Sequence, residues 1–387
     1  MSGSLCLGGS STFLCNFAGE LVRRSIPTEV LSLHNAGPLA ADFARMNVPV
    51  RSMGNRPGIF EDRLQSILRL LKEFNPTVVA ATLSPSSFEV LRYMPAGVFR
   101  VVVGQSDEPQ VYKALAAYAQ HMDMLAVVSQ TMKRNAEAMP EFAGLRICSL
   151  PYGVPIPEAL PARDFERPLR ILYLGRLYRE QKRVQIFPTI LDQLRASGIP
   201  FHWTIAGDGD EKARLEETMR NTVADQTVLF PGPIPYSNIL PLLLAHDVFL
   251  LASDYEGLPL SLLEAMGCGL VPVVSDLPSG ISEAVNEATG KRVPPANISG
   301  YADAIIWLHF HRVELRRLSD NAREMARSVF SVATMTDRWL DALPPSPSSG
   351  IIWPERWKIR PILVASKKWI FSPPMRVVRR RLVRFRK

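Results

Sequence analysis

Short apolar runs alternate with amphipathic stretches along the first half of the chain, and each predicts an element of secondary structure. Within Phe60–Phe74, the residues Leu64, Ile67, Leu68 and Leu71 recur at the spacing of one helix face. Runs with strand character are Glu29–Leu33, Thr77–Thr82, Phe99–Val103, Met124–Val128 and Ile147–Leu150. Because strands separated by helices favour parallel βαβ units and a doubly wound sheet, we expect an α/β fold.

The second half repeats this alternation after the proline-rich segment Pro151–Pro168, which we interpret as a linker. Its predicted strands are Arg170–Leu174, His202–Ala206, Thr227–Phe230, Val248–Leu251 and Val271–Ser275. Its predicted helices are Lys212–Met219, Ile239–Leu244, Leu260–Met266, Gly300–His309 and Val313–Val329. Two Rossmann-like halves predict a cleft between them, with ligands at the carboxyl ends of the strands.

We therefore divide the chain into three parts. Residues 1–155 are predicted to form one Rossmann-like domain and 168–343 a second, followed by a Pro/Ser linker and basic amphipathic tail at 344–387. The length of 387 residues agrees with two domains, because single cores stop growing near about 250–300 residues. The beginning is unusual, since only Ser4–Leu7 precedes the Gly8-Gly9 loop as a strand; this strand is either very short or begins upstream.

Positive charge is concentrated in the tail. Twelve Lys or Arg and no acidic residue fall in 356–387, so the preceding 355 residues carry −4 of the formal net +8. Met375, Val378, Leu382 and Phe385 share one helix face, with arginines around it, which favours binding of residues 353–387 to an anionic membrane surface. The alternatives are a solvated tail packed partly across the first domain, and RNA binding. No base-reading module accompanies the charge, so we expect no nucleic-acid partner.

The cysteines and the hydropathy pattern favour a cytoplasmic protein. Cys6, Cys15, Cys148 and Cys268 are scattered without a CxxC pair, which indicates a reducing compartment and argues against a structural zinc site. The longest apolar run, around Ile239–Ala252, contains a His and an Asp and predicts no membrane span. The N-terminus shows no signal-peptide pattern.

Two glutamates form the densest chemical signal. Glu256 is expected in the loop after a strand, and Glu264 two turns into the following helix, which Pro259 suits as a first-turn residue. The backbone amides of Gly257, Leu258 and Leu260 would face the cleft with the positive end of the helix dipole and form an anion or hydroxyl site. Two carboxylates at this spacing can contact two parts of one polyhydroxylated ligand; the alternative is a solvated acidic pair flanking a core helix.

A second signal follows the strand Arg170–Leu174. Gly175 and Arg176 come directly after it and Lys182 lies six residues further, so a guanidinium fork and an ammonium can clamp a diphosphate. Ordinary surface charge is the alternative. The Ala206–Asp210 stretch, with glycines alternating with aspartates, is interpreted as a tight strand-to-helix turn near the ligand rather than a metal site.

Taken in order, these motifs resemble the family 4 glycosyltransferases of GT-B fold. The resemblance covers residues 5–341 and is strongest at 170–293. It rests on the Gly175–Lys182 stretch, the Ala206–Gly209 turn, Val228–Gly232, the Glu-x7-Glu box at 256–264, Val273–Asp276, Thr289-Gly290, Val128-Ser129 and Tyr152–Val154.

The resemblance implies an enzyme that transfers a sugar from a nucleotide diphosphate sugar to a hydroxyl of a saccharide or lipid-linked acceptor, with retention and without metal or other cofactor. The first domain would be the acceptor side and the second would bind the donor. Arg176 and Lys182 would neutralise the donor diphosphate, and Glu264 would accept hydrogen bonds from the ribose. Glu256 with the Gly257–Pro259 loop would hold the donor sugar. Gly8 and Gly9 match the family's N-terminal glycine loop near the phosphates.

One departure concerns the acceptor side. Many family members carry a His after the fourth first-half strand, but here Phe99–Val103 is followed by Gly104, Gln105, Ser106 and Asp107. Gln105 could hydrogen-bond the sugar, and Asp107 could act as a base or orient the acceptor hydroxyl; a capping role for Asp107 is the alternative. The missing His also motivates a second hypothesis, a catalytically inactive GT-B module that binds nucleotide sugar.

Overall fold

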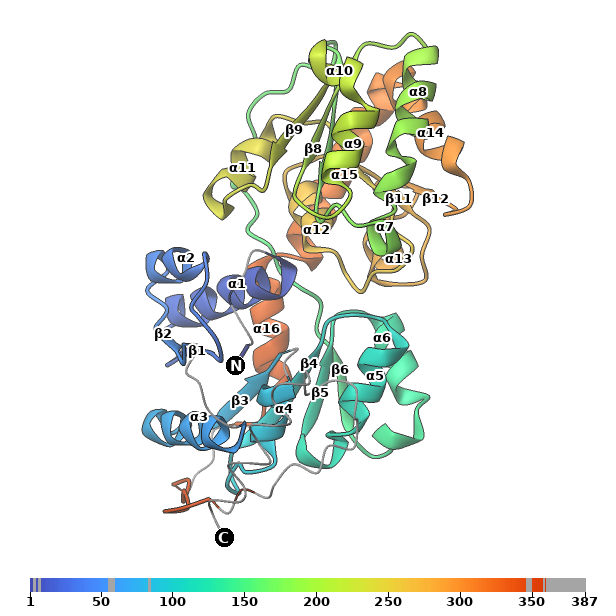
Figure 1. Ribbon diagram of the computed structural model, residues 1–387. Helices are drawn as coiled ribbons and strands as arrows, with labels where there is room; N and C mark the ends of the chain where they lie inside the picture. The colour runs from blue at the N-terminus through green and yellow to red at the C-terminus, as the bar shows by residue number, and fades with distance from the viewer. Residues whose placement is uncertain are drawn as a thin grey trace.

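A four-stranded parallel sheet in the N-terminal half of the chain and a six-stranded parallel sheet in the C-terminal half organise the molecule (Figure 1). The computed structural model describes all residues except 3, 4, 6, 7, 55–59, 83, 84, 346–349, 358 and 360–387. The amphipathic tail helix expected around Met375 and Phe385 therefore lies outside the described residues, as does most of the strand predicted at Ser4–Leu7.

In the N-terminal half, a pair of parallel strands and a four-stranded parallel sheet lie on either side of the first residues of the chain. The strands are β1 (Val30–Ser32) and β2 (Val50–Ser52) in the pair, and β3 (Val78–Ala81), β4 (Phe99–Gly104), β5 (Met124–Val127) and β6 (Arg146–Ser149) in the sheet. Ser2 N–H donates to Leu31 O at 3.1 Å, while the Met1 ammonium donates to Ala80 O at 2.6 Å. The start of the chain thus connects β1 to β3.

Helices cover these strands because their apolar residues fall on one face. In α3 the four leucine and isoleucine residues predicted at helical spacing are the buried ones. The α-helices of this half are α1 (Gly9–Arg23), α2 (Ala40–Arg45), α3 (Phe60–Phe74), α4 (Pro85–Leu91), α5 (Pro109–Ala116) and α6 (Gln130–Glu137). Two short 3₁₀ helices, η1 (Ala119–His121) and η2 (Pro140–Phe142), complete it.

The C-terminal half is built on a six-stranded parallel sheet of order β12-β11-β10-β7-β8-β9. The strands are β7 (Leu169–Leu174), β8 (Phe201–Ala206), β9 (Val228–Gly232), β10 (Val248–Leu251), β11 (Val271–Ser275) and β12 (Lys291–Val293). Every residue of β10 and β11 is buried, as expected for strands covered on both faces.

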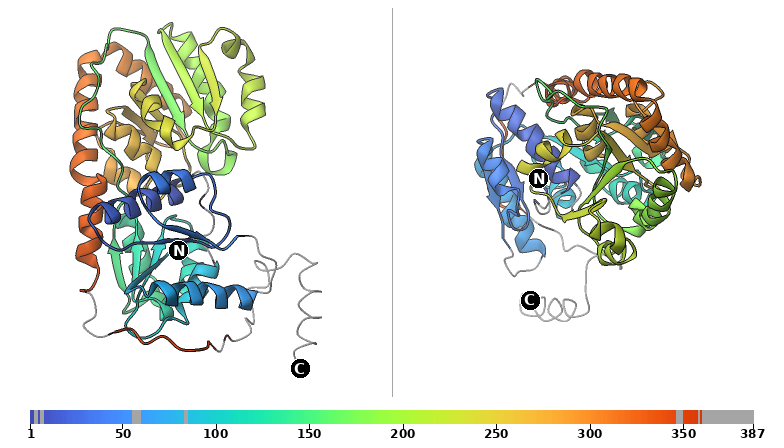
Figure 2. Two further views of the ribbon diagram at one scale, coloured as in Figure 1. Left: turned by 90° about the vertical axis from the view of Figure 1, so that its left-hand side faces the viewer. Right: turned by 90° about the horizontal axis from the view of Figure 1, so that it is seen from above.

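Helices lie on both faces of this sheet (Figure 2). They are α7 (Arg179–Lys182), α8 (Phe187–Ala196), α9 (Lys212–Thr218), α10 (Arg220–Ala224), α11 (Tyr236–Leu244), α12 (Leu260–Gly267), α13 (Gly280–Ala284), α14 (Ile298–Phe310), α15 (Arg312–Val329) and the 3₁₀ helix η3 (Val184–Ile186). The α/β fold with two Rossmann-like sheets agrees with the sequence-based prediction.

The last helix within the described residues, α16 (Val332–Ala342), returns to the N-terminal half, although the sequence placed it in the second domain. Trp339 is 2 % exposed and packs on α1, with ring centroids 4.9 Å from Phe17 and 6.2 Å from Phe13. The chain crosses between the halves at Val154, whose N–H donates to Phe330 O at 2.8 Å. The aromatic contacts of α16, rather than its position after α15, decide which half it joins.

The ten strands predicted from Glu29–Leu33 to Val271–Ser275 are all present, with ends that agree within two residues. The sequence missed β2 and β12, which are three residues long and mix charged with apolar side chains. The predicted Gly8-Gly9 loop is short, because the helix α1 already begins at Gly9.

The described part of the C-terminal segment packs across the base of the N-terminal half (Figure 2). Trp353 Nε1 donates to Asn75 Oδ1 at 2.7 Å, and Lys72 Nζ donates to Pro354 O at 3.1 Å. Of the helices that the structure describes, none combines the length and apolar character needed to cross a membrane.

Candidate active site

The candidate residues gather where the carboxyl ends of strands in the two sheets face each other. The loops after β7, β8 and β10 come from the C-terminal half, and the loop after β4 comes from the N-terminal half. Figure 1 shows α7, α12 and α13 at the edge of the upper half that faces α1 and α6. This is the edge at which open parallel sheets bind ligands.

A buried ion pair joins two of the predicted residues. Lys182, at the end of α7, donates from Nζ to Glu256 Oε1, and the two residues are 8 % and 7 % exposed. Ser253 Oγ donates to the same carboxylate oxygen at 2.7 Å. Since a buried charge needs a partner, the ammonium, the hydroxyl and the carboxylate form one unit.

Arg176 lies beside this unit without joining it. Its guanidinium is exposed, donates to Gln181 Oε1 at 2.6 Å and lies over the Tyr178 ring, 5.2 Å from the centroid. Gln181 Nε2 in turn donates to Tyr255 O at 3.3 Å, which links Arg176 to the loop that carries Glu256. The predicted pair of cations is therefore one buried ammonium and one exposed guanidinium.

Backbone contacts between the loops after β7 and β8 require glycine. A Cβ on Gly207, where φ is +144°, would lie 1.8 Å from Gly175 O, and one on Gly209, where φ is +155°, 2.5 Å from Leu177 O. Leu177 N–H donates to Asp208 O at 2.8 Å. The Ala206–Asp210 stretch is thus a tight turn held against the Gly175–Leu177 loop.

Gly257 marks a close contact between the two halves. A Cβ at this position would lie 2.7 Å from Gln105 O, so glycine lets the donor-side loop approach the end of β4. Gln105 is 9 % exposed, and neither its amide nitrogen nor its amide oxygen has a hydrogen-bond partner among the described residues, although the Tyr152 phenol lies beside it. A buried amide without partners can accept and donate bonds to a bound hydroxylated ligand.

Glu264 occupies a different environment from Glu256. It is partly buried in α12, and burial raises the pKa of its carboxyl from 4.5 to about 8. No hydrogen bond or ion pair offsets this cost within the part of the chain that the structure describes. Leu258 and Pro259 are buried just before it, and Pro259 is the N-cap of α12 rather than a residue of its first turn.

The N-terminal glycines lie next to α12. Gly8 is the exposed N-cap of α1, and a Cβ on it would meet open space. Gly9 faces the first residue of α12, because a Cβ on Gly9 would lie 3.6 Å from Leu260 Cδ1. The N-termini of α1 and α12 therefore meet across the boundary between the halves.

Asp107 is held by residues of the N-terminal half. Its Oδ1 accepts hydrogen bonds from Tyr112 Oη at 2.5 Å and Asn135 Nδ2 at 3.0 Å. Glu108, not Asp107, is the N-cap of α5, and no side chain caps that helix. The alternative of a capping aspartate therefore does not describe its observed contacts.

Sequence reasoning missed several residues that connect the site. Ser253 supports Glu256, and Gln181 joins Arg176 to the loop after β10. Tyr236, at the start of α11, donates from its hydroxyl to Asn16 Oδ1 of α1 at 2.7 Å, a second bridge between the halves. Only the position of Ser253 in the loop before Glu256 gave a signal in the sequence.

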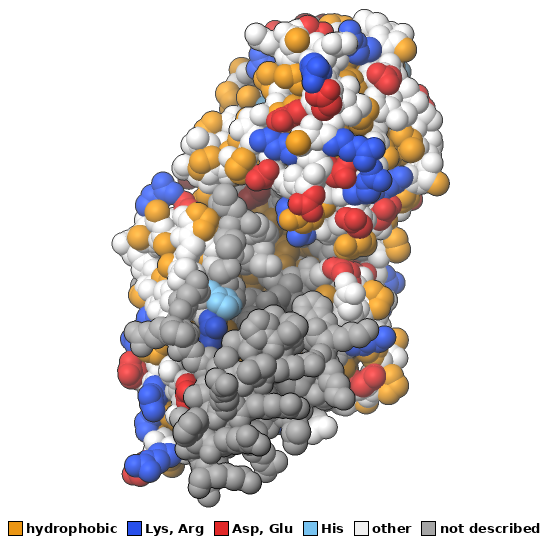
Figure 3. Space-filling view, viewed as in Figure 1, with side chains coloured by type: hydrophobic (Ala, Val, Ile, Leu, Met, Phe, Trp, Pro, Cys, Tyr) orange, Lys and Arg blue, Asp and Glu red, His pale blue; other side chains and the backbone are white. Residues whose placement is uncertain are grey.

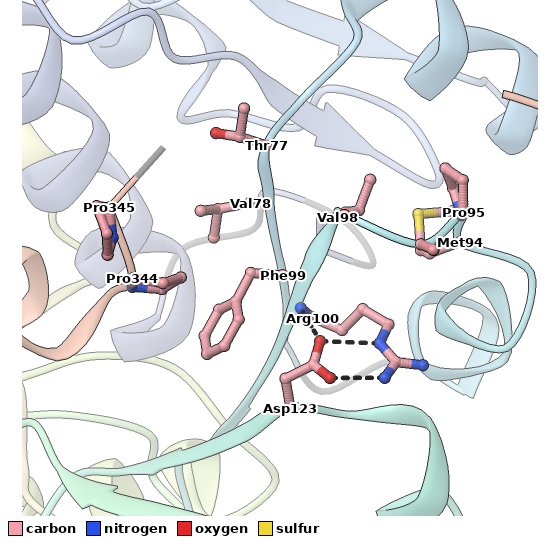
Figure 4. A pocket seen from close by; sticks show the side chains of 12 residues that line it. Thr77, Val78, Met94, Pro95, Val98, Phe99, Arg100, Asp123, Pro344 and Pro345 are labelled. Atoms are coloured by element: carbon pink, nitrogen blue, oxygen red, sulfur yellow. Dashed lines mark hydrogen bonds and ion pairs between the residues drawn. The ribbon is translucent and has the colours of Figure 1, made fainter. Parts of the chain in front are cut away.

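A separate cavity of about 540 Å³ lies at the opposite, amino-terminal ends of β3 and β4 (Figure 4). Its lining includes Phe99, Pro344 and the ion pair of Arg100 with Asp123, at 2.6 Å. Because it is remote from the carboxyl ends of the strands, we do not assign it to the candidate site.

On the face shown in Figure 3, cationic and acidic side chains are interspersed over the C-terminal half. Among the described residues, no group of three His, Cys, Asp or Glu side chains could hold a metal ion.

Comparisons with known proteins bear on the C-terminal half first. Residues 168–310 match the family described as "Glycosyl transferases group 1". The chain is 32 % identical over 179 residues to the putative colanic acid biosynthesis glycosyltransferase WcaL of Escherichia coli (strain K12), covering 44 % of each chain. It is 34 % identical over 157 residues to the amylovoran biosynthesis glycosyltransferase AmsK of Erwinia amylovora, covering 38 % of each. The chain thus spans less than half the length of the curated relatives it matches.

The whole architecture resembles solved structures at low identity. Anabaena HepE, whose structure is in complex with UDP, superposes with a TM-score of 0.71 at 16 % identity, covering 88 % of this chain and 97 % of HepE. Such a likeness establishes the fold, which is GT-B. The match to the glycosyl transferases group 1 family lies within the C-terminal half of this fold.

Proposed function

We propose that this protein is a retaining glycosyltransferase that moves a sugar from a nucleotide diphosphate sugar to a hydroxyl of a saccharide or lipid-linked acceptor in cell-surface polysaccharide synthesis. The observation that carries the proposal is the buried Lys182–Glu256 pair at the carboxyl ends of strands, within a glycosyl transferases group 1 domain. The names of WcaL and AmsK support a role in polysaccharide synthesis, and HepE in complex with UDP supports a nucleotide-sugar donor.

On the donor side, Lys182 and Arg176 neutralise the diphosphate as it leaves with the electron pair of the broken bond to the sugar. Lys182 serves as a preorganised charge because Glu256 and the fold fix its ammonium. Arg176 is exposed and can fold onto the donor with its guanidinium fork. This arrangement assigns to two side chains the charge neutralisation that a metal ion performs in other transferases.

The carboxylates of Glu264 and Glu256 bind two other parts of the donor, the ribose and the sugar. Glu264 accepts hydrogen bonds from the ribose hydroxyls, in a position where no protein group competes among the described residues. Glu256 and the Gly257–Pro259 loop hold the donor sugar and support positive charge on it in the transition state. Gly8 and Gly9 let the phosphates approach the backbone at the start of α1.

On the acceptor side, Gln105 and Asp107 follow β4. Gln105 lies beside Gly257 and the Tyr152 phenol, and its amide atoms lack a well-formed hydrogen bond within the described part of the chain, so it can hydrogen-bond the donor sugar or the incoming acceptor. Asp107 orients the acceptor hydroxyl or takes its proton through the carboxylate oxygen that Tyr112 and Asn135 leave free. These two residues stand where many family members have a His.

Incubating the purified full chain with labelled UDP- and GDP-sugars and with lipid and glycan extracts is expected to transfer label to a product. The anomeric configuration of that product should match the donor, which NMR of the new linkage can establish. If nucleotide sugars raise the unfolding temperature while prolonged incubation gives no product, the inactive binding module is correct instead. The absence of both binding and transfer would overturn both hypotheses.

We further propose that the protein is cytoplasmic and that its basic tail attaches it to the inner face of the cell membrane. The charge of residues 356–387 supports this, and the described segment around Trp353 gives the tail a fixed departure point at the base of the N-terminal half. Chains ending at Leu343 or at Ile359 should both fail to sediment with anionic vesicles, whereas the full chain sediments and is released by salt. Unchanged sedimentation of the chain ending at Ile359 would exclude the tail as the anchor.

A further inference from the structure

Glu283 makes a contact between the two halves that the proposed function does not use. It belongs to α13 in the C-terminal half, and its carboxylate accepts the backbone N–H groups of Gln130 and Thr131 at 3.1 Å each. These are the first two residues of α6 in the N-terminal half. Figure 1 shows α13 directly facing α6 across the boundary.

The contact completes the first turn of α6. The first N–H groups of a helix have no intrahelical partner and carry the positive end of the helix dipole. Ser129 satisfies one of them from within the same half, because its Oγ accepts from Met132 N at 3.1 Å. The Glu283 carboxylate, which comes from the opposite half, accepts two more of these N–H groups. All N–H groups of the first turn of α6 therefore have hydrogen-bond partners only while the two halves are in contact.

The same helix holds Asp107. Asn135 lies one turn further along α6 and donates to Asp107 Oδ1 at 3.0 Å. Tyr112, which donates to the same oxygen, also lies 3.4 Å from Met132 O of α6. A displacement of α6 therefore moves two of the groups that fix the Asp107 carboxylate.

On its other side, α13 supports the donor loop. Gly280 N–H donates to Gly257 O at 2.7 Å, and a Cβ on Gly280 would lie 2.6 Å from that oxygen. One short helix thus touches the loop that carries Glu256 and, through Glu283, the helix that holds Asp107. It therefore connects the two sides of the candidate site.

We propose that Glu283 is a positioning residue that holds the two halves together at α6 and so keeps the half that carries Asp107 in register with the loop that carries Glu256. The proposal rests on the proposed transferase function for its kinetic consequence, whereas its structural consequence is independent of any activity. Glu283 acts through α6 and touches no reacting group.

The test compares Glu283→Ala and Glu283→Gln with Glu287→Ala, an exposed carboxylate three residues beyond α13 for which no ion pair or hydrogen bond is observed. Glu283→Gln keeps the side-chain shape and one acceptor oxygen, so it remains informative if the alanine variant folds poorly. Small-angle X-ray scattering of each free protein should give a larger radius of gyration for Glu283→Ala than for the wild type, with Glu283→Gln between them.

In the transfer assay with the sugar nucleotide that the wild type turns over, Glu283→Ala should lower kcat by about 10- to 100-fold with donor KM nearly unchanged. A merely structural cap would lower stability and leave kcat of the folded protein unaltered. An unchanged radius of gyration, or an unchanged kcat, in folded Glu283→Ala overturns the proposal. If the wild type transfers no sugar, the proposed function fails, and the scattering result alone decides whether Glu283 holds the halves together.

Discussion

Replacing Lys182 by Met is expected to lower kcat/KM for sugar transfer by about 10²- to 10³-fold. The ammonium is buried at the end of α7 and fixed by Glu256, and in the proposed function it neutralises the leaving diphosphate. The substitution also leaves Glu256 buried without its cation, which destabilises the folded state by about 3–5 kcal/mol. Loss of activity in this variant alone could therefore reflect unfolding.

The double variant Lys182→Met with Glu256→Gln separates loss of activity from unfolding for the ion pair as a unit, because both residues belong to the proposed site. It removes both buried charges, so the free energy of unfolding measured in urea should recover most of the loss while kcat/KM stays at least as low as in Lys182→Met. Arg327→Met is the matched control, because Arg327 and Glu324 form an exposed ion pair on α15 and should change stability by less than about 1 kcal/mol. Wild-type kcat/KM in a folded Lys182→Met protein would contradict the role assigned to Lys182.

Donor affinity is expected to rise about 100-fold between pH 6 and pH 9 through Glu264. Burial raises the pKa of this carboxyl to about 8, so about 1 % of the free protein carries the ionised form at pH 6. If the ribose hydroxyls bind the carboxylate, the apparent affinity scales with that ionised fraction. Calorimetric titration with a nucleotide sugar measures this, since its diphosphate ester lacks the terminal phosphate that titrates near pH 6.

Glu264→Gln is the control for this pH dependence. It should flatten the curve, because the amide does not titrate, and any slope that remains belongs to other groups. Stability provides an independent measure of the raised pKa: between pH 4.5 and about 8 the folded state retains a proton that the unfolded state releases. The wild-type free energy of unfolding should therefore fall relative to Glu264→Gln across this range. If that difference appears while donor affinity is flat, the pKa is raised but Glu264 does not bind the ribose as a carboxylate.

Much of the fold could be predicted because apolar runs and helical spacing within short segments indicate its strands and helices. Val248–Leu251 is a continuous apolar run and becomes a strand buried in the centre of the second sheet. The helix Phe60–Phe74 has its buried residues at the predicted spacing. The three-residue strands β2 and β12 gave no such signal, because they are too short for a period and form by pairing with neighbours.

The candidate site was predictable residue by residue but not as an arrangement. Lys182 and Glu256 were both predicted to contact the donor, yet their ion pair joins positions 74 residues apart and depends on how β7 and β10 lie in the sheet. Gly257 was predicted as part of an anion-binding loop, whereas its contact with Gln105 depends on how the halves meet. Contacts between segments that are distant in the sequence cannot be predicted from the local spacing of hydrophobic residues.

The sequence by itself determined the alternation of strands and helices and the α/β class of both halves, because these follow from hydrophobic spacing. It also singled out the candidate site residues, because they lie in motifs a few residues long. Only the tertiary structure decided that α16 packs on α1, that Asp107 is held by Tyr112 and Asn135, and that Glu283 completes the first turn of α6. Each of these depends on groups brought together across distant parts of the chain, where packing and electrostatics select one arrangement among many that the local sequence allows.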